Sequence, residues 1–402
     1  MRYQSYFNSA LTIINAYKGG APLVHHLKQY FAAHKKHGST DRRTIAHLCY
    51  TYYRLGASIK EFDTDKGLQL AIFLCEAKPG NWALLFEPNW LAAWGSLEQK
   101  LDFIKEVYPG YNLASIFPFA AHLSSSVDAP AFNRSHLTQP DLFIRIRPKQ
   151  EAAVVAKLIK AQITFEKITD TCYRLPSGTK LEEVLLINKE VVIQDYSSQQ
   201  IAGMYALATA FADSKKRIWD CCAASGGKSI LAVDTFGQIK LTASDMRASI
   251  LRNLQTRFAA AGMNGYQSFA VDLTSAHDLS NFAKLADFII CDAPCTGSGT
   301  WGRTPEHLAF FDEVSIDNFR QLQQNIITNT IPYVAVGGYF LYSTCSVFAA
   351  ENEGQALLIT KTKAAEAEGN AIKIAANAER EAAQLRGQGV ALFRQEVAKG
   401  MT

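Results

Sequence analysis

The sequence lacks two features that membrane and secreted proteins carry: a run of eighteen or more apolar residues and an N-terminal signal peptide. It also lacks a strong charge bias, since 41 Lys and Arg against 37 Asp and Glu leave a formal net charge of +4 over 402 residues. That balance permits a nucleic-acid partner without requiring one. Eight cysteines in a chain without secretory signals favour a reducing, cytoplasmic location.

Two glycine patterns of nucleotide-binding loops are missing as well. Gly227-Lys228-Ser229 has the tail of a phosphate-binding loop, but Cys222 occupies the position of its leading glycine, and the pattern G-x-G-x-x-G does not occur there. What remains is a stretch of small residues at the start of a predicted helix, where a cofactor can approach the backbone closely. This stretch comprises Cys222, Ala223, Ala224, Ser225, Gly226, Gly227 and Lys228.

Acidic residues end the next two predicted strands. One strand runs from Gln238 to Asp245 and the other from Gln267 to Asp272. Ligands of open α/β sheets bind outside the carboxyl ends of the strands, where a carboxylate on the second strand suits ribose hydroxyls. A polar group on the third strand suits an adenine edge. We therefore expect a nucleoside-containing ligand at this edge.

Three motifs in order carry a family resemblance: Asp220 to Ser229, Cys291 to Gly299, and Tyr342 to Ser346. They resemble the RNA (cytosine-5) methyltransferase family, which has Asp-x-Cys-Ala-Ala-Pro-Gly-Gly-Lys, then Asp-Ala-Pro-Cys-Ser-Gly, then Ser-Thr-Cys-Ser. The resemblance covers roughly residues 190 to 353. Ser225 replaces the family's proline, which we expect to loosen the loop modestly, and Ser229 replaces a threonine.

The resemblance implies a cofactor, S-adenosylmethionine, held by Cys222 to Lys228, Asp245, Asp272 and Asp292. It also implies that Cys345 is the nucleophile and Cys295 assists product release, with Asp292 bonding the base or positioning the thiol. Two thiols suit this chemistry, because C5 of cytosine is a poor nucleophile until a thiolate adds at C6, and a base must later remove the C5 proton. Cys295 and Cys345 follow the ends of two predicted strands that we expect to be neighbours, about 4.8 Å apart, so both could reach one base. The residues alone do not say which thiol attacks.

The remaining cysteines have a simpler interpretation. An intracellular cysteine is most often a small buried apolar residue, and we interpret Cys49, Cys75, Cys172, Cys221 and Cys291 in this way. Cys291-x-x-x-Cys295 has zinc-ligand spacing, but no second pair of cysteines or histidines lies at the usual distance. We expect no metal site.

Residues 1 to about 135 show helical periodicity, with a helix predicted from a capping Asp41 to Leu55. This helix resembles part of the antitermination-factor-like domain that precedes family members acting on small-subunit ribosomal RNA. The basic stretch from His34 to Arg43 suits phosphates or is only a solvated face. A small α+β lobe is predicted over residues 140–190.

In this lobe, strands are predicted over 141–147, 165–175 and 183–187, and a helix over 151–162. It resembles the family's RNA-binding lobe. Arg145 and Arg147 project from one strand face, where they contact RNA or lie on the wet side of the strand.

The end of the chain departs from the family. Residues 355–402 are rich in Ala, Glu and Lys and predict a charged helix over 363–400. They resemble the helical segment of stomatins, prohibitins and flotillins. A fusion, a chimeric coding sequence or a diverged end would explain this, and we favour the second. Without two closing strands, the strand from Tyr339 to Tyr342 is expected to be an exposed edge with uncovered apolar surface beside Cys345.

The predicted protein is therefore multidomain: a helical N-terminal domain (1–135), the α+β lobe (140–190), a Rossmann-like α/β methyltransferase domain (191–354) and the helical tail. The predicted activity is methylation of cytosine C5 in RNA, with small-subunit ribosomal RNA as the preferred partner and no membrane partner. Two alternatives stay open, a transfer RNA methyltransferase and a non-catalytic RNA-binding or assembly factor.

Overall fold

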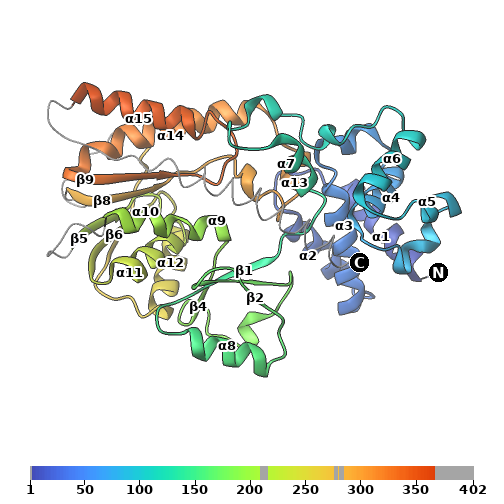
Figure 1. Ribbon diagram of the computed structural model, residues 1–402, viewed down its shortest axis with the longest axis horizontal. Helices are drawn as coiled ribbons and strands as arrows, with labels where there is room; N and C mark the ends of the chain where they lie inside the picture. The colour runs from blue at the N-terminus through green and yellow to red at the C-terminus, as the bar shows by residue number, and fades with distance from the viewer. Residues whose placement is uncertain (1, 209–215, 276–278, 280–284, 367–402) are drawn as a thin grey trace. The chain divides into compact units, whose positions relative to one another are not determined.

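The computed structural model describes residues 2–208, 216–275, 279 and 285–366, which form two compact units (Figure 1). The first unit comprises residues up to 123 together with 128–140 and 298–313. The second comprises 124–127, 141–297 and the chain from 314 onward. The segment that follows the Cys295 loop thus belongs to the helical unit.

The first unit is helical, as its periodicity predicts. Its core contains Ile13, Leu48 and Ile72, each fully buried, which come from three different helices. The α-helices are α1 (Arg2–Ala16), α2 (Leu23–Ala33), α3 (Ser39–Tyr53), α4 (Thr64–Cys75), α5 (Pro88–Ala92), α6 (Leu97–Val107), α7 (Ala129–Ser135) and α13 (Glu306–Ala309). Short 3-10 helices are η1 (Gly56–Glu61), η2 (Gly80–Leu85), η3 (Leu113–Ile116), η4 (Ala120–His122) and η6 (Ser298–Thr300).

Helix α3 begins two residues earlier than predicted. Its N-cap is Gly38, and Asp41 lies in the first turn, where its carboxylate accepts a hydrogen bond from the Gly38 amide at 2.9 Å. Asp41 therefore stabilises the helix start as an acidic residue of the first turn rather than as the N-cap itself.

The second unit contains a five-stranded parallel sheet of order β7-β6-β5-β8-β9. Its helices cover both faces, with Tyr205 and Phe258 buried on one and Ile326 and Ile359 on the other. This is the predicted Rossmann-like fold. The strands are β5 (Lys216–Asp220), β6 (Ile239–Asp245), β7 (Gln267–Ala270), β8 (Ala286–Asp292) and β9 (Val334–Ser343). The helices are α9 (Tyr196–Gln199), α10 (Ile201–Ala208), α11 (Gly227–Phe236), α12 (Ala248–Ala260), α14 (Val314–Thr330), η7 (Ile331–Tyr333) and α15 (Glu353–Glu366).

Strand β9 lies at the edge of this sheet within the described residues. The prediction of uncovered apolar surface there is nevertheless wrong, because Phe340, Leu341 and Tyr342 are at most 3% exposed. Helices α14 and α15 lie on the face that includes Phe340 and Tyr342, as Figure 1 shows. Residues 367–402, which include most of the predicted charged helix, lie outside the described residues.

A smaller antiparallel sheet of order β2-β3-β1-β4 precedes the large one in the chain. Its elements are β1 (Leu142–Ile146), α8 (Glu151–Lys160), β2 (Glu166–Lys167), β3 (Cys172–Leu175), η5 (Leu181–Glu183) and β4 (Val191–Ile193). The strand predicted over 183–187 is wrong, since the fourth strand lies a few residues later. Leu181 and Leu185 are buried from a 3-10 turn, whose apolar spacing imitates strand alternation over so short a stretch.

Arg145 and Arg147 do not lie on a solvent-exposed strand face where they could contact RNA. Both pair with Asp234 of α11, at 2.6 and 2.7 Å, and the Asp234 side chain is 6% exposed. Arg147 also donates to the carbonyl of Ala261 at 2.6 Å. These arginines fasten the small sheet to the large one, so the RNA-contact interpretation is wrong for them.

Among the described helices, none is long and apolar enough to cross a bilayer.

Candidate active site

The small residues after β5 form a tight loop that leads into α11. Ala224 and Gly226 both adopt the left-handed region, with φ of 46° and 81°. A Cβ on Gly226 would lie 2.4 Å from the Phe258 ring, so only glycine fits between this loop and α12. At Gly227, by contrast, no atom lies within 4 Å of the position of a Cβ. The loop is thus packed against α12 at Gly226 and open at Gly227, where α11 begins.

Carboxylates support this loop. The Ser229 hydroxyl donates to buried Asp220 at 2.6 Å, and burial raises the pKa of Asp220 to about 7. Asp245, at the end of β6, accepts from the Ala224 amide at 3.0 Å and from the Arg247 amide at 2.9 Å. The predicted cofactor carboxylate Asp245 therefore also fixes the loop.

Asp272 lies beyond the end of β7, where it accepts hydrogen bonds from the amide and hydroxyl of Thr274 at 2.9 and 2.7 Å. It is exposed, whereas Asp245 is 8% exposed. Both carboxylates thus stand at the carboxyl edge of the sheet, as the strand pattern predicts.

Lys228 and Asp292 meet between the first loop and the end of β8. Their side chains pair at 2.5 Å, and the Ser343 hydroxyl donates to the other carboxylate oxygen at 3.0 Å. Burial opposes charge on Lys228, but the Asp292 carboxylate outweighs it, and the pKa of Lys228 is raised. This pair places the Lys228 and Asp292 side chains beside Cys345.

Cys295 and Cys345 come together as their strand ends predict. Strands β8 and β9 are adjacent and parallel, and the two sulfur atoms lie 3.3 Å apart. Either thiol can donate in this contact, and the hydrogen bond with Cys295 lowers the pKa of Cys345, with help from Lys228 and against burial. The same contact, with burial, raises the pKa of Cys295. Cys345, the more exposed of the two, is thus the better thiolate.

Glu351 is a residue of this site that the sequence did not single out. Its side chain is fully buried and accepts from the Thr296 amide and hydroxyl at 2.9 and 2.6 Å. It also accepts from the Ser346 hydroxyl at 2.6 Å and from Gln323 at 3.0 Å. Thr296 follows Cys295 and Ser346 follows Cys345, so one carboxylate holds both cysteine loops. No local pattern in the sequence marks Glu351, because its partners Thr296 and Ser346 belong to two loops that only the fold brings together.

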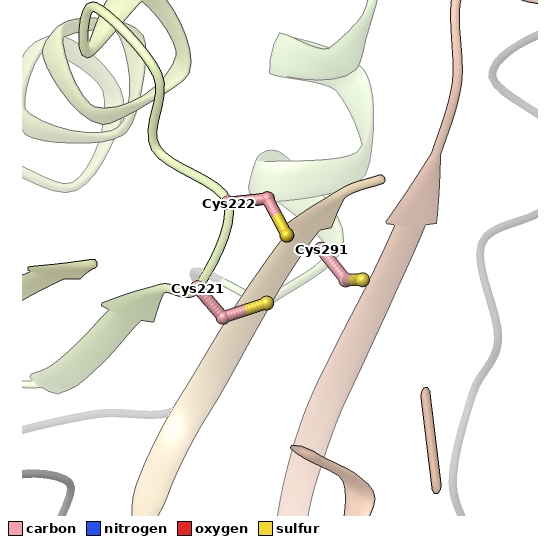
Figure 2. A group of neighbouring side chains, drawn as sticks. All are labelled: Cys221, Cys222 and Cys291. Carbon is pink, nitrogen blue, oxygen red and sulfur yellow. The ribbon is translucent and has the colours of Figure 1, made fainter. Parts of the chain in front are cut away.

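The cysteines interpreted as buried apolar residues differ in their surroundings. Cys49, Cys172, Cys221 and Cys291 are buried, whereas Cys75 is only partly so. Cys221 and Cys291 are not isolated, however, because with Cys222 they form a group whose sulfur atoms all lie within 4.8 Å of one another (Figure 2). Cys291 thus groups with these two residues rather than with Cys295.

The parallel sheet, its loop of small residues and the cysteines at two strand ends define a Rossmann-like methyltransferase domain. A family model described as 16S rRNA methyltransferase RsmB/F matches residues 206–388. The predicted resemblance to RNA (cytosine-5) methyltransferases of the small-subunit type is thereby confirmed. The match continues past Gly354 to residue 388, so it includes much of the segment that is predicted to depart from the family.

Similar proteins carry related names. The chain is 31% identical over 211 residues to ribosomal RNA small subunit methyltransferase B of Xanthomonas campestris, a match that covers 51% of this chain and 46% of that protein. It is 28% identical over 225 residues to a probable ribosomal RNA small subunit methyltransferase B of Synechocystis, with 54% and 49% covered. The chain thus spans about half the length of the curated relatives that it matches.

Solved structures support the fold. PH0851 aligns with a TM-score of 0.62 and 18% identity, over 89% of both chains. A methyltransferase homologue from Pyrococcus horikoshii aligns with a TM-score of 0.51 and 19% identity, over 64% of this chain and 81% of that one.

Proposed function

We propose that this chain transfers a methyl group from S-adenosylmethionine to C5 of a cytosine in small-subunit ribosomal RNA, through a covalent bond between Cys345 and C6. The observation that carries this proposal is the pair of sulfur atoms 3.3 Å apart at the ends of adjacent strands, beside Lys228 and Asp292. A ribosomal substrate in turn implies a cytoplasmic location.

The side chains divide the work. The Cys345 thiolate forms a bond to C6, and the displaced electron pair makes C5 nucleophilic. Asp292, held by Lys228 and Ser343, would bond the base edge or position the thiol. After methylation, Cys295 lies close enough to take part in removing the C5 proton, whose electron pair then expels the Cys345 sulfur. The target base must be single-stranded or flipped out for C6 to be reached.

The loop fits the proposed cofactor, which when bound supplies an electrophilic methyl group. The open space at Gly227 lets a ligand approach the backbone at the start of α11. The stretch from Cys222 to Lys228 and the carboxylates Asp245, Asp272 and Asp292 would hold it, since all lie at the carboxyl edge of the sheet.

The names of the relatives and the RsmB/F family match support small-subunit ribosomal RNA over transfer RNA. Incubation with labelled cofactor and separate RNA pools tests this choice. We expect label in small-subunit ribosomal RNA, and label in transfer RNA alone would contradict the substrate.

A Cys295→Ala variant tests the covalent mechanism. Without the residue that assists release, the enzyme should accumulate an RNA adduct through Cys345, visible as a band that resists denaturing electrophoresis. The double variant Cys295→Ala/Cys345→Ala should form no adduct. Absence of an adduct in the single variant, together with absence of turnover in the unchanged protein, would instead indicate a non-catalytic RNA-binding factor.

A further inference from the structure

We propose that Cys221, Cys222 and Cys291 form a binding site for a soft, thiophilic cation that accepts three thiolate ligands, such as trivalent arsenic. This site lies under the loop after β5 and shares no sulfur with the Cys295–Cys345 pair. The proposal does not depend on methyl transfer.

The fold brings the three cysteines together from two neighbouring strands. β5 and β8 are parallel partners, and the Cys221 amide donates to the carbonyl of Ile290 at 2.9 Å. The carbonyl of Cys221 in turn accepts from the Ser244 hydroxyl at 3.0 Å. Backbone bonds therefore fix Cys221 beside the end of β8, and Cys222 follows directly.

The sulfur positions suit a shared ligand. All three lie within 4.8 Å of one another. Thiolates around a tetrahedral zinc with bonds of about 2.3 Å stand about 3.8 Å apart, so side-chain rotation closes the remaining gap. Figure 2 shows the sulfur atoms of Cys221 and Cys222 on the side of the loop that faces the strand carrying Cys291.

The surroundings favour a soft cation. Cys221 is 1% and Cys291 0% exposed, and both pack in a cluster with Trp219, Phe340 and Tyr342. Water and hard oxygen ligands are largely excluded there, and thiolates select soft metals. Among the described residues, no histidine or carboxylate joins the group, which leaves three sulfur donors. A three-coordinate cation needs no fourth donor atom. Cys222, which is partly exposed, provides the route of entry.

The binding reaction is an exchange of ligands without oxidation. Arsenous acid gives up three hydroxyl groups, three As–S bonds form, and the three thiol protons leave with the hydroxyls as water. Because Cys222 also belongs to the loop proposed to hold the cofactor, an occupied thiol site should weaken cofactor binding.

Intact-protein mass spectrometry after incubation with arsenite tests the site. The full chain should gain one arsenic atom and lose three hydrogens, and this gain should persist in the variant Cys295→Ser/Cys345→Ser. Cys49→Ala, which removes an equally buried thiol of the helical unit, is the matched control and should also retain it.

Cys291→Ala and, separately, Cys222→Ala should abolish the three-thiol adduct. Far-ultraviolet circular dichroism checks that each variant is folded, and Cys222 provides the less buried position should Cys291→Ala fail to fold. Absence of the adduct in the unchanged protein, its persistence in Cys222→Ala, or its loss in Cys295→Ser/Cys345→Ser would overturn the proposal. None of these outcomes depends on whether the chain methylates RNA.

Discussion

Two groups of thiols lie close together in the chain, since Cys291 and Cys295 are four residues apart, yet their surroundings differ. Cys291 is the last residue but one of strand β8, lies inside an apolar cluster and meets Cys221 and Cys222. Cys295 lies past the strand end, where it meets Cys345 among Lys228, Asp292 and the loops held by Glu351. The difference teaches that thiols four residues apart can differ in exposure and partners, since Cys291 is buried whereas Cys295 is partly exposed beside the exposed Cys345. Four substitutions test this contrast.

The largest effect is expected for Cys345→Ala. Loss of a nucleophile that forms a bond to the substrate should lower turnover by a factor on the order of 10³ or more. The measurement is incorporation of label from the cofactor into RNA. The melting temperature should change little, because Cys345 is exposed. Turnover within ten-fold of the unchanged protein would remove Cys345 from the mechanism.

Substitution of Glu351 should have the next largest effect. In Glu351→Ala both cysteine loops lose their common acceptor, and we expect turnover to fall by about 10²-fold because small displacements of reacting groups cost about that much. Glu351→Gln, which keeps one acceptor oxygen, should fall less. The KM for RNA should change less than kcat.

The matched control for Glu351 is Glu353→Gln. Glu353 accepts from the Ser124 hydroxyl at 2.8 Å, and among the described contacts it does not bond to either cysteine loop. The contrary outcome is that Glu351→Gln lowers only the melting temperature and leaves unchanged both kcat and the pH dependence of Cys345 alkylation by iodoacetamide. In that case Glu351 is structural rather than a positioning residue.

Cys295→Ala should change how Cys345 responds to pH. The hydrogen bond between the two thiols lowers the pKa of Cys345. Without that hydrogen bond, the inflection of the alkylation rate against pH should move upward, and alkylation at pH 7 should slow. Mass spectrometry of the peptide containing Cys345 after iodoacetamide treatment measures this rate. Cys172→Ala, in the small sheet, should leave the inflection unchanged.

The smallest effect on turnover is expected for Cys291→Ala. Removing one buried sulfur should cost about 1–2 kcal/mol of unfolding free energy and leave turnover within about three-fold, a free-energy change of under about 1 kcal/mol. Denaturant unfolding and label incorporation measure the two quantities. A loss of turnover comparable to that of Cys345→Ala would show that the packed thiols also serve catalysis.

The sequence alone predicts several strand ends, one helix start and the meeting of two cysteines in the second unit. The strands ending at Asp245 and Asp292, the helix opening at Gly227 and the adjacency of Cys295 and Cys345 follow from apolar runs that stop at small or polar residues. The position of the site at the carboxyl edge of the sheet follows from the rule that ligands of open α/β sheets bind outside the carboxyl ends of the strands.

Long-range pairings account for what the sequence does not reveal. Arg145 and Arg147 alternate as if on a wet strand face, and only the position of Asp234 on α11 shows that they are buried. Glu351 lies 55 residues after Thr296, so its two roles appear only once β8 and β9 are neighbours. Cys221 and Cys291 each look like lone core residues, because 70 residues separate them.

The ion pairs of Arg145 and Arg147 with Asp234 make the catalytic sheet depend on the small sheet. Asp234 lies on the same helix that opens with the loop of small residues, and its carboxylate is neutralised only by side chains from the preceding small sheet among the contacts described. Grafting the catalytic sheet alone onto another scaffold would remove both arginines from this carboxylate, together with the small sheet that carries them. The smallest transplantable piece of the second unit therefore includes the small sheet, from residue 141 onward, rather than starting at β5.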